Sequence, residues 1–214
     1  MMTAILTTAR LVFKNSIARQ KAIDAFHKII EYTIPHEPHV LQYVCALPVD
    51  DSSGTEIYMI EEYANQEASD THLAAKPVQD LIQLFTTGDV LAQPPEVHNS
   101  KVIVKKSSGM PIPVSSNPAV VLMNIPSKPE LSTKDKERWR EMSSIVMKSV
   151  KGVSAFTVVE DQEVNSMRVE AVLQSWDAFA EYQDFMIDGR QDGAVMVKIR
   201  PIDGFVGRES TSKL

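Results

Sequence analysis

The feature that most limits how this chain can fold is an order of secondary structure that occurs twice. Apolar periodicity predicts strand, helix, strand, strand, helix and strand over Thr3–Lys105, and the same order over Ala119–Arg200. Between these stretches, Ser107–Pro118 holds Gly109 and three prolines among serines, a composition typical of an extended connector. The chain therefore divides into two halves of similar construction.

The first half contains one internal break that its sequence marks clearly. A helical pattern runs from Gln66 to Phe85 and includes Pro77. We expect this proline to divide the helix, because an interior proline removes a hydrogen bond and clashes with the preceding turn. The remaining elements of this half are expected to be strands at Thr3–Phe13, Val40–Pro48, Glu56–Ala64 and Val97–Lys105 and a helix at Ser16–Thr33.

The second half begins its first helix with a recognisable capping signal. Ser132 stands three residues before Asp135, the spacing at which two side chains cap a helix start reciprocally. The expected helices are Ser132–Val150 and Ser175–Ile187, and the expected strands are Ala119–Ile125, Val153–Gln162, Met167–Gln174 and Ala194–Arg200. The residues from Pro201 onwards are expected to form a tail.

This order of elements specifies the fold class. A β-α-β-β-α-β order forms a ferredoxin-like α+β unit, with both helices on one face of a four-stranded antiparallel sheet. The other sheet face would expose an apolar surface, so we predict that the two units pack sheet on sheet as an intrachain dimeric α/β barrel. The expected organisation is a first unit over residues 1–106, a linker over 107–118, a second unit over 119–206 and a tail over 207–214.

Charge and cysteine content exclude several classes of protein. The chain has 22 basic and 28 acidic residues and a net charge of -6, so we expect no nucleic-acid partner. A single cysteine, Cys45, excludes an intrachain disulfide and a multi-thiolate cluster. No apolar run approaches the roughly 20 residues of a membrane helix, and the start lacks a secretion signal, so we expect a soluble intracellular protein without membrane association.

Acid–base chemistry near neutral pH rests on the five histidines. Nucleotide-binding glycine motifs are absent from the sequence, so we expect neither a nucleotide nor a flavin. His36 and His39 have ligand-like spacing but no third ligand, and we expect no metal site. His72 lies on the apolar face of a helix, where it is either a hydrogen-bonded core residue or a catalytic base.

One residue of the second half is a further candidate for ligand contact. Asn124 is the one amide in the apolar strand Ala119–Ile125, and it either contacts a ligand or marks the end of the strand. Trp176 begins the last helix and shares a stripe with Phe179, a pattern more typical of core packing. The sequence leaves both alternatives open for Asn124 and favours core packing for Trp176.

The run Ile60–Tyr63, followed by Ala68 and His72, is a strand that ends in an aromatic residue and leads into a helix with Ala and then His. In this motif the chain resembles the antibiotic biosynthesis monooxygenase family of dimeric α/β barrels. The second half departs from the motif, because it has Tyr182 or Gln183 where His72 would align. The chain therefore looks like a tandem fusion of two such units, of which the second is degenerate.

The resemblance implies a cofactor-independent monooxygenase that oxidises a small lipophilic or aromatic metabolite of polyketide or oxylipin type, with molecular oxygen as the co-substrate and without flavin, haem or metal. His72 would be the catalytic base or proton shuttle. Tyr63, Asn124 and Trp176 would bind the substrate in an apolar barrel cavity. The alternatives are a non-catalytic or stress-related small-molecule-binding barrel and a haem-degrading relative. The oligomeric state is expected to be a monomer or a homodimer.

The last three residues, Ser212, Lys213 and Leu214, match the tripeptide that the peroxisomal import receptor reads at a carboxyl terminus. The residues before them are polar, which is typical of an accessible tail. We therefore expect the import receptor to be a partner and the peroxisome to be the location of the protein.

Removal of Leu214 tests this targeting signal. A fluorescent protein fused ahead of the full chain should become punctate and overlap a peroxisomal marker, because the receptor requires the intact tripeptide. The same fusion without Leu214 should stay diffuse. A diffuse signal from the intact fusion would show that the tripeptide is not read.

Overall fold

The computed structural model describes residues 4–109, 112–126, 132–161, 163–164, 166–187 and 194–208. The predicted targeting residues, Ser212, Lys213 and Leu214, lie outside this part of the chain. The first half consists of β1 (Ile5–Val12), α1 (Ser16–His36), β2 (Val40–Pro48), β3 (Glu56–Tyr63), α2 (Gln66–Ala74), α3 (Lys76–Thr87) and β4 (Glu96–Ser107). The second half consists of β5 (Ala119–Pro126), α4 (Thr133–Ser149), β6 (Val153–Asp161), β7 (Ser166–Leu173), α5 (Trp176–Ile187) and β8 (Val195–Phe205), after a 3-10 turn, η1 (Val114–Ser116).

Local sequence signals explain where several of these helices begin and end. Ser132 and Asp135 form the predicted capping box at the start of α4. The predicted break in the second helical region is also confirmed, since Ala75 is extended between α2 and α3. Pro77 stands in the first turn of α3, where its missing N–H would have no partner in any case.

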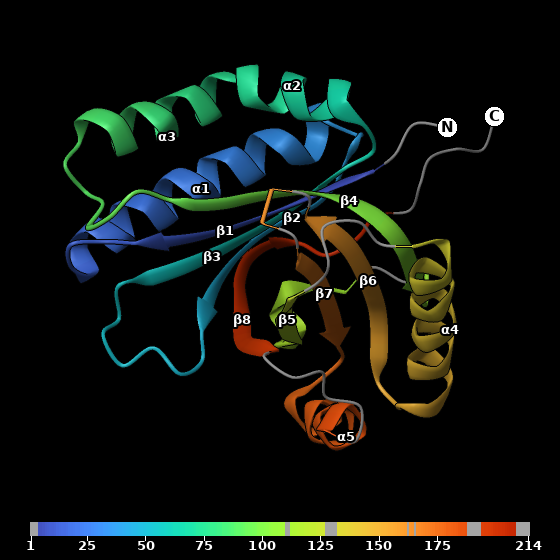
Figure 1. Cartoon of the computed structure of the whole chain (residues 1–214). Coiled ribbons are helices and arrows are strands. Elements are labelled where there is room, and N and C mark those ends of the chain that lie inside the picture. The colour runs from blue at the N-terminus through green and yellow to red at the C-terminus, as the bar shows by residue number, and fades with distance from the viewer. Residues whose placement is uncertain are drawn as a thin grey trace.

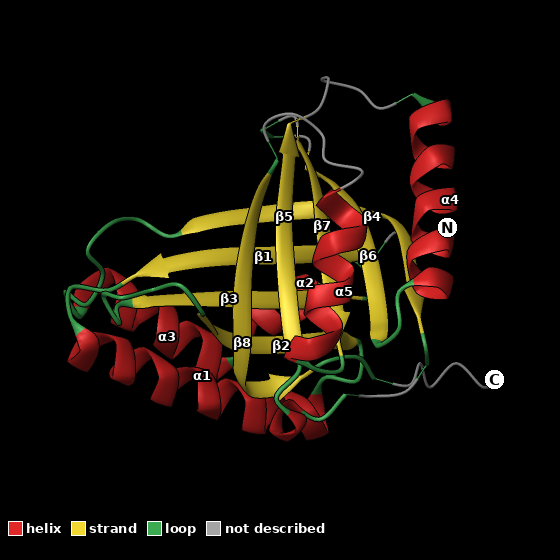
Figure 2. Ribbon diagram, turned by 90° about the horizontal axis from the view of Figure 1, so that it is seen from below, coloured by secondary structure: helices red, strands yellow, loops and turns green. Residues whose placement is uncertain are grey.

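The strands form one closed barrel in the order β1-β3-β2-β8-β5-β7-β6-β4. Each half keeps the strand order of a ferredoxin-like unit, β4-β1-β3-β2 in the first half and β8-β5-β7-β6 in the second. The two units join edge to edge, because β2 pairs with β8 and β4 pairs with β6, both antiparallel. The predicted fold class is confirmed. Figure 2 shows that the strands of the first half run across those of the second.

Three apolar clusters match this architecture. Helices α1, α2 and α3 lie together over the outer face of the first sheet (Figure 1) and bury a cluster that includes Phe26, Ile29 and Met59. Helices α4 and α5 lie over the second half, where Phe156 belongs to the corresponding cluster. The third cluster fills part of the barrel interior and draws residues from both halves, including Leu6, Val44, Ile60, Val120, Val172 and Ile199.

Strand β8 corrects one prediction about the end of the second half. The sequence predicts a strand that ends at Arg200, whereas β8 continues to Phe205. The additional residues pair with β2, and Gly204 lies opposite Val44. Gly204 has φ +107°, and a Cβ atom there would lie 2.0 Å from the carbonyl oxygen of Tyr43, so glycine is required for this close approach. The extension depends on a partner strand in the other half, which the local pattern does not show.

None of the helices in the described ranges is long and apolar enough to cross a membrane.

Expression of the first half alone, Met1–Ser108, tests how far the two halves depend on each other. In this fragment the edges of β2 and β4 lose their partner strands, and buried interior residues such as Leu6 and Ile60 lose their cover. We expect aggregation or a self-paired dimer in size-exclusion chromatography with light scattering. A monodisperse monomer that unfolds cooperatively would contradict this dependence.

Candidate functional site

Helix α2 places His72 against the outer face of the first sheet. The side chain of Asn65 caps the helix by accepting a hydrogen bond from the backbone N–H of Ala68 at 2.9 Å, so α2 begins directly after β3. His72 follows two turns later on the face that packs against the strands, and only 1% of its surface is exposed. The imidazole is therefore a buried polar group that needs a partner.

Glu37, which follows α1, provides that partner. Nδ1 of His72 lies 2.8 Å from Oε2 of Glu37, and the hydroxyl of Thr33 donates to the same carboxylate oxygen at 2.7 Å. Burial on its own would raise the pKa of Glu37, but the hydrogen bonds from His72 and Thr33 and the charges of His72 and Arg208 hold this pKa below its ordinary value. Because an ionised carboxylate only accepts hydrogen bonds, we assign a proton to Nδ1, which leaves Nε2 as the ring nitrogen that does not face Glu37.

Two tyrosine rings flank the imidazole. The ring centroids of Tyr43 and Tyr63 lie 5.1 Å and 5.5 Å from that of His72. The Tyr63 hydroxyl donates a hydrogen bond to Glu61, and burial raises the pKa of both phenols, so they remain protonated. Burial also raises the pKa of Glu61, although the charge of His72 and the hydrogen bond from Tyr63 oppose this shift. We refer to Thr33, Glu37, Tyr43, Glu61, Tyr63 and His72 as the His72 cluster.

An arginine from the other end of the chain fixes the position of Glu37. Arg208 follows β8 and donates to the backbone carbonyls of Glu37 at 2.9 Å and Thr33 at 3.0 Å, which satisfies acceptors at the end of α1. Thr33, Glu37 and Arg208 are not among the site residues that the sequence pattern predicts. The signal for the first two is an acid four residues after a threonine at the end of an amphipathic helix, beside His36 and His39.

Strand pairing aligns the second half with the first, residue by residue. Tyr63 pairs with Ile5 and Val40, and Leu173 pairs with Ala119 and Val153 in the same way. The helices align through their caps, because the Ser175 side chain accepts from the N–H of Ala178 as Asn65 accepts from that of Ala68. Tyr182, and not Gln183, therefore takes the position of His72.

The second half replaces all six residues of the His72 cluster, five of them with apolar residues. Tyr182 stands in place of His72, and its hydroxyl is buried without a hydrogen-bond partner among the described residues. The other replacements are Val146 for Thr33, Val150 for Glu37, Phe156 for Tyr43, Ala171 for Glu61 and Leu173 for Tyr63. No imidazole or carboxylate occupies these positions, so the aligned residues of the second half offer no equivalent base.

The structure brings together only two of the four predicted catalytic and substrate-binding residues. His72 and Tyr63 are neighbours in the His72 cluster. Asn124 lies on β5 and lines a pocket on the inner side of the barrel wall. Trp176 lies at the start of α5 in the second half, where its ring contacts Phe179 and Arg200. Asn124 and Trp176 therefore do not share a site with His72.

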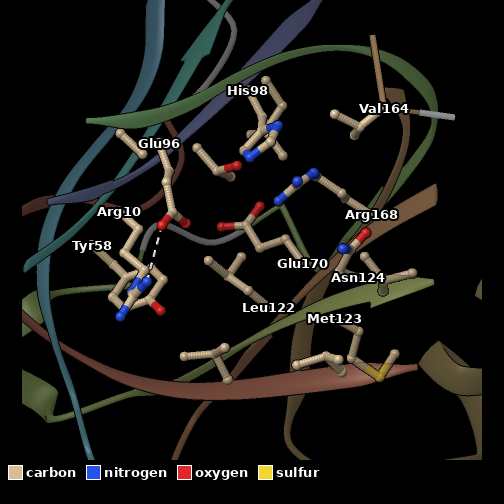
Figure 3. A pocket seen from close by; sticks show the side chains of 16 residues that line it. Arg10, Tyr58, Glu96, His98, Leu122, Met123, Asn124, Val164, Arg168 and Glu170 are labelled. Carbon is tan, nitrogen blue, oxygen red and sulfur yellow. Dashed lines mark hydrogen bonds and ion pairs between the residues drawn. The ribbon is translucent and has the colours of Figure 1, made fainter. Parts of the chain in front are cut away.

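The pocket that contains Asn124 differs from the apolar barrel cavity that the sequence analysis expects. Its volume is about 460 Å³, and Figure 3 shows charged side chains around it. The charged or titratable lining residues are Arg10, Tyr58, Glu96, His98, Arg168 and Glu170. Thr8, Asn124 and apolar residues such as Leu122 complete the lining. We refer to this space as the barrel pocket.

Part of the first half matches a known protein family. Residues 17–84 match the model of a family described as antibiotic biosynthesis monooxygenase. A comparison with curated proteins finds no match. The matched segment includes all six residues of the His72 cluster.

Solved structures match both halves of the chain. A candidate monooxygenase from Lactobacillus acidophilus is 17% identical, with a TM-score of 0.75 over 96% of this chain and 99% of that one. A candidate monooxygenase from Fusobacterium nucleatum is 18% identical, with a TM-score of 0.76 over 95% and 94%. An anthrone oxidase-like protein is 12% identical, with a TM-score of 0.64 over 99% and 95%.

These structural similarities establish the fold over both halves, and the family match covers the residues around His72. Residues 17–84 of the first half therefore match the antibiotic biosynthesis monooxygenase family model, and the second half repeats the fold of the first.

Proposed function

We propose that this protein is a cofactor-independent monooxygenase that oxidises a small lipophilic or aromatic metabolite at the His72 cluster. The observation that carries the proposal is the buried pair of His72 and Glu37, which lies within the segment that matches the family model. The aligned positions of the second half have Tyr182 and Val150 instead. One half of the chain thus retains a positioned base, and the other half retains only the fold.

The hydrogen bond between His72 and Glu37 gives the imidazole its role. Glu37 accepts the hydrogen bond from Nδ1–H of His72. Nε2 is therefore available to accept a proton from an acidic C–H or a phenolic O–H of the substrate. The carboxylate then stabilises the imidazolium that forms. The rings of Tyr43 and Tyr63 provide an apolar wall against which an aromatic substrate can pack.

The substrate itself supplies the electrons for the oxidation. For an acidic methylene group, loss of a proton to His72 gives a carbanion, which transfers electrons to molecular oxygen and forms a carbon–oxygen bond. The resulting peroxide takes the proton back from His72, and loss of water leaves a ketone. One oxygen atom enters the product and the other leaves as water. This balance requires no flavin, haem or metal.

Substrate access requires a movement of α2, because His72 is almost completely buried. This helix has nine residues and ends at Ala74, and the extended backbone of Ala75 separates it from α3. Its buried residues are Ala68, Ser69 and His72, so few side chains attach it to the sheet. We expect α2 to move independently of α3 when a substrate enters.

Substitution of His72 tests the catalytic role. Anthrone is a suitable probe because it has an acidic methylene group between two aryl rings, and its oxidation to the ketone follows the scheme above. Loss of a positioned general base costs about 10²–10⁴-fold in rate, so His72→Ala and His72→Gln should lower enzyme-dependent oxygen uptake by that order. Uptake is measured against an enzyme-free blank, and the product is identified by mass spectrometry.

Tyr182→Phe is the matched control, because Tyr182 holds the aligned position in the second half. Its hydroxyl has no hydrogen-bond partner among the described residues, so its removal should change neither turnover nor stability appreciably. A histidine with a purely structural role gives a different pattern, in which His72→Ala loses roughly 1–3 kcal/mol of unfolding free energy but keeps wild-type turnover. That pattern, or the absence of oxygen uptake with any acidic aromatic substrate, would favour the non-catalytic alternative.

A further inference from the structure

The barrel pocket lies on the opposite face of the first sheet from the His72 cluster. Alternate residues of a strand point to opposite faces, so in β3 Tyr58 lines the pocket whereas Glu61 and Tyr63 belong to the His72 cluster. The volume of about 460 Å³ falls within the range of small-molecule sites. Residues of both halves line the pocket, so it exists only where the two sheets meet.

Two buried hydrogen-bonding atoms at this pocket lack partners. Oγ1 of Thr8 and Oδ1 of Asn124 are buried without a hydrogen bond to any described residue. Thr8 as a whole is only 6% exposed. An unsatisfied buried polar atom costs about 1–3 kcal/mol, so two such atoms beside one cavity favour the binding of a group that completes their hydrogen bonds.

Glu170 is the third polar group of the pocket and is only 2% exposed. Figure 3 shows its carboxyl group directed toward the middle of the cavity. Nε2 of Gln42 donates to Oε1 of Glu170 at 2.5 Å. Burial raises the pKa of Glu170 to about 7, and Glu62 adds to the shift, while the hydrogen bond from Gln42 and the charge of Lys105 oppose it.

The cationic groups of the pocket already have acidic partners. Arg10 binds Glu56 at 2.7 Å and Glu96 at 3.0 Å, and Nε of Arg168 donates to Asp161 at 3.2 Å. The pocket therefore presents no unpaired cation to an anionic ligand among the described residues. The polar atoms of the pocket that lack partners can accept hydrogen bonds. Residues such as Leu6, Leu122 and Val197 supply apolar walls.

We propose that the barrel pocket binds a small neutral molecule with hydroxyl groups on an aromatic ring, and that these hydroxyls donate to Asn124 and Glu170. Thr8 makes a further hydrogen bond, and the apolar side chains pack against the ring. This site is distinct from the His72 cluster in its face of the sheet and in its residues. It does not depend on the proposed oxygenase reaction.

Calorimetric titration with resorcinol tests this site, because resorcinol carries two hydroxyls on one ring. The reference ligand is 1,3-dimethylbenzene, which has the same shape and no donors. We expect resorcinol to bind at least about tenfold more tightly than the reference, since only resorcinol satisfies the buried acceptors. Equal affinity of the two ligands, or no binding of resorcinol, would overturn the proposal.

Variants locate the binding to the pocket. Asn124→Leu and the nearly isosteric Thr8→Val should each weaken resorcinol binding about tenfold. The matched control is Asn99→Leu, which makes the same change at an exposed position on β4. Thr8→Val keeps the test decisive if Asn124→Leu does not fold. Unchanged affinity in Thr8→Val, or a loss of affinity in His72→Gln instead, would place the ligand elsewhere and refute the proposal.

The pH dependence tests the contact with Glu170. An ionised carboxylate accepts a stronger hydrogen bond than a neutral acid, so affinity should rise between about pH 6 and pH 8 as Glu170 loses its proton. Glu170→Gln should bind with little change over this range. The other charged or titratable groups around Glu170 are Glu62, His98, Lys105, Asp161 and Arg168. Because histidine is also pH-sensitive, His98→Gln is the control and should retain the rise; a flat profile in that variant alone would exclude Glu170 as the contact.

Discussion

Main-chain pairing between the two halves is the constraint on which the rest of the structure depends. β2 pairs with β8 and β4 pairs with β6, so the described strands leave no open edge and both inner sheet faces are covered. These ladders consist of backbone hydrogen bonds, which depend little on side-chain identity. The outer faces of the two sheets are therefore free to differ in sequence while the barrel remains closed.

The His72 cluster illustrates this freedom. A buried pair of imidazole and carboxylate pays a desolvation cost, and apolar residues of similar volume often stabilise a protein equally well or better. The second half has such residues at the aligned positions, including Val150 and Phe156, and both belong to its buried apolar cluster. Packing alone thus does not require His72 and Glu37 in the first half. This asymmetry supports a chemical role for the pair.

The same strands serve two different environments because their side chains alternate. On β3, Glu61 and Tyr63 face helix α2, whereas Tyr58 and Glu62 face the barrel interior. The interior is not a uniform apolar core, since paired charges and the barrel pocket occupy one region and the third apolar cluster fills another. A closed barrel can contain these polar groups because residues from the opposite sheet provide partners, as Glu170 does for Gln42.

The sequence by itself determined the repeated order of elements, the capping of α4, the break before Pro77 and the closure of two sheets into a barrel, because these follow from local periodicity and from apolar faces that must be covered. It also singled out His72 and Tyr63 as candidate site residues, and these two lie close together along the chain and in the structure. Only the tertiary structure decided that Glu37 binds His72, that Arg208 holds the end of α1 and that Asn124 faces a separate pocket. Glu37 and Arg208 are 171 positions apart, and their contact depends on the extension of β8 along β2. Such contacts are set by the register between strands that lie far apart along the chain, and local patterns carry no information about that register.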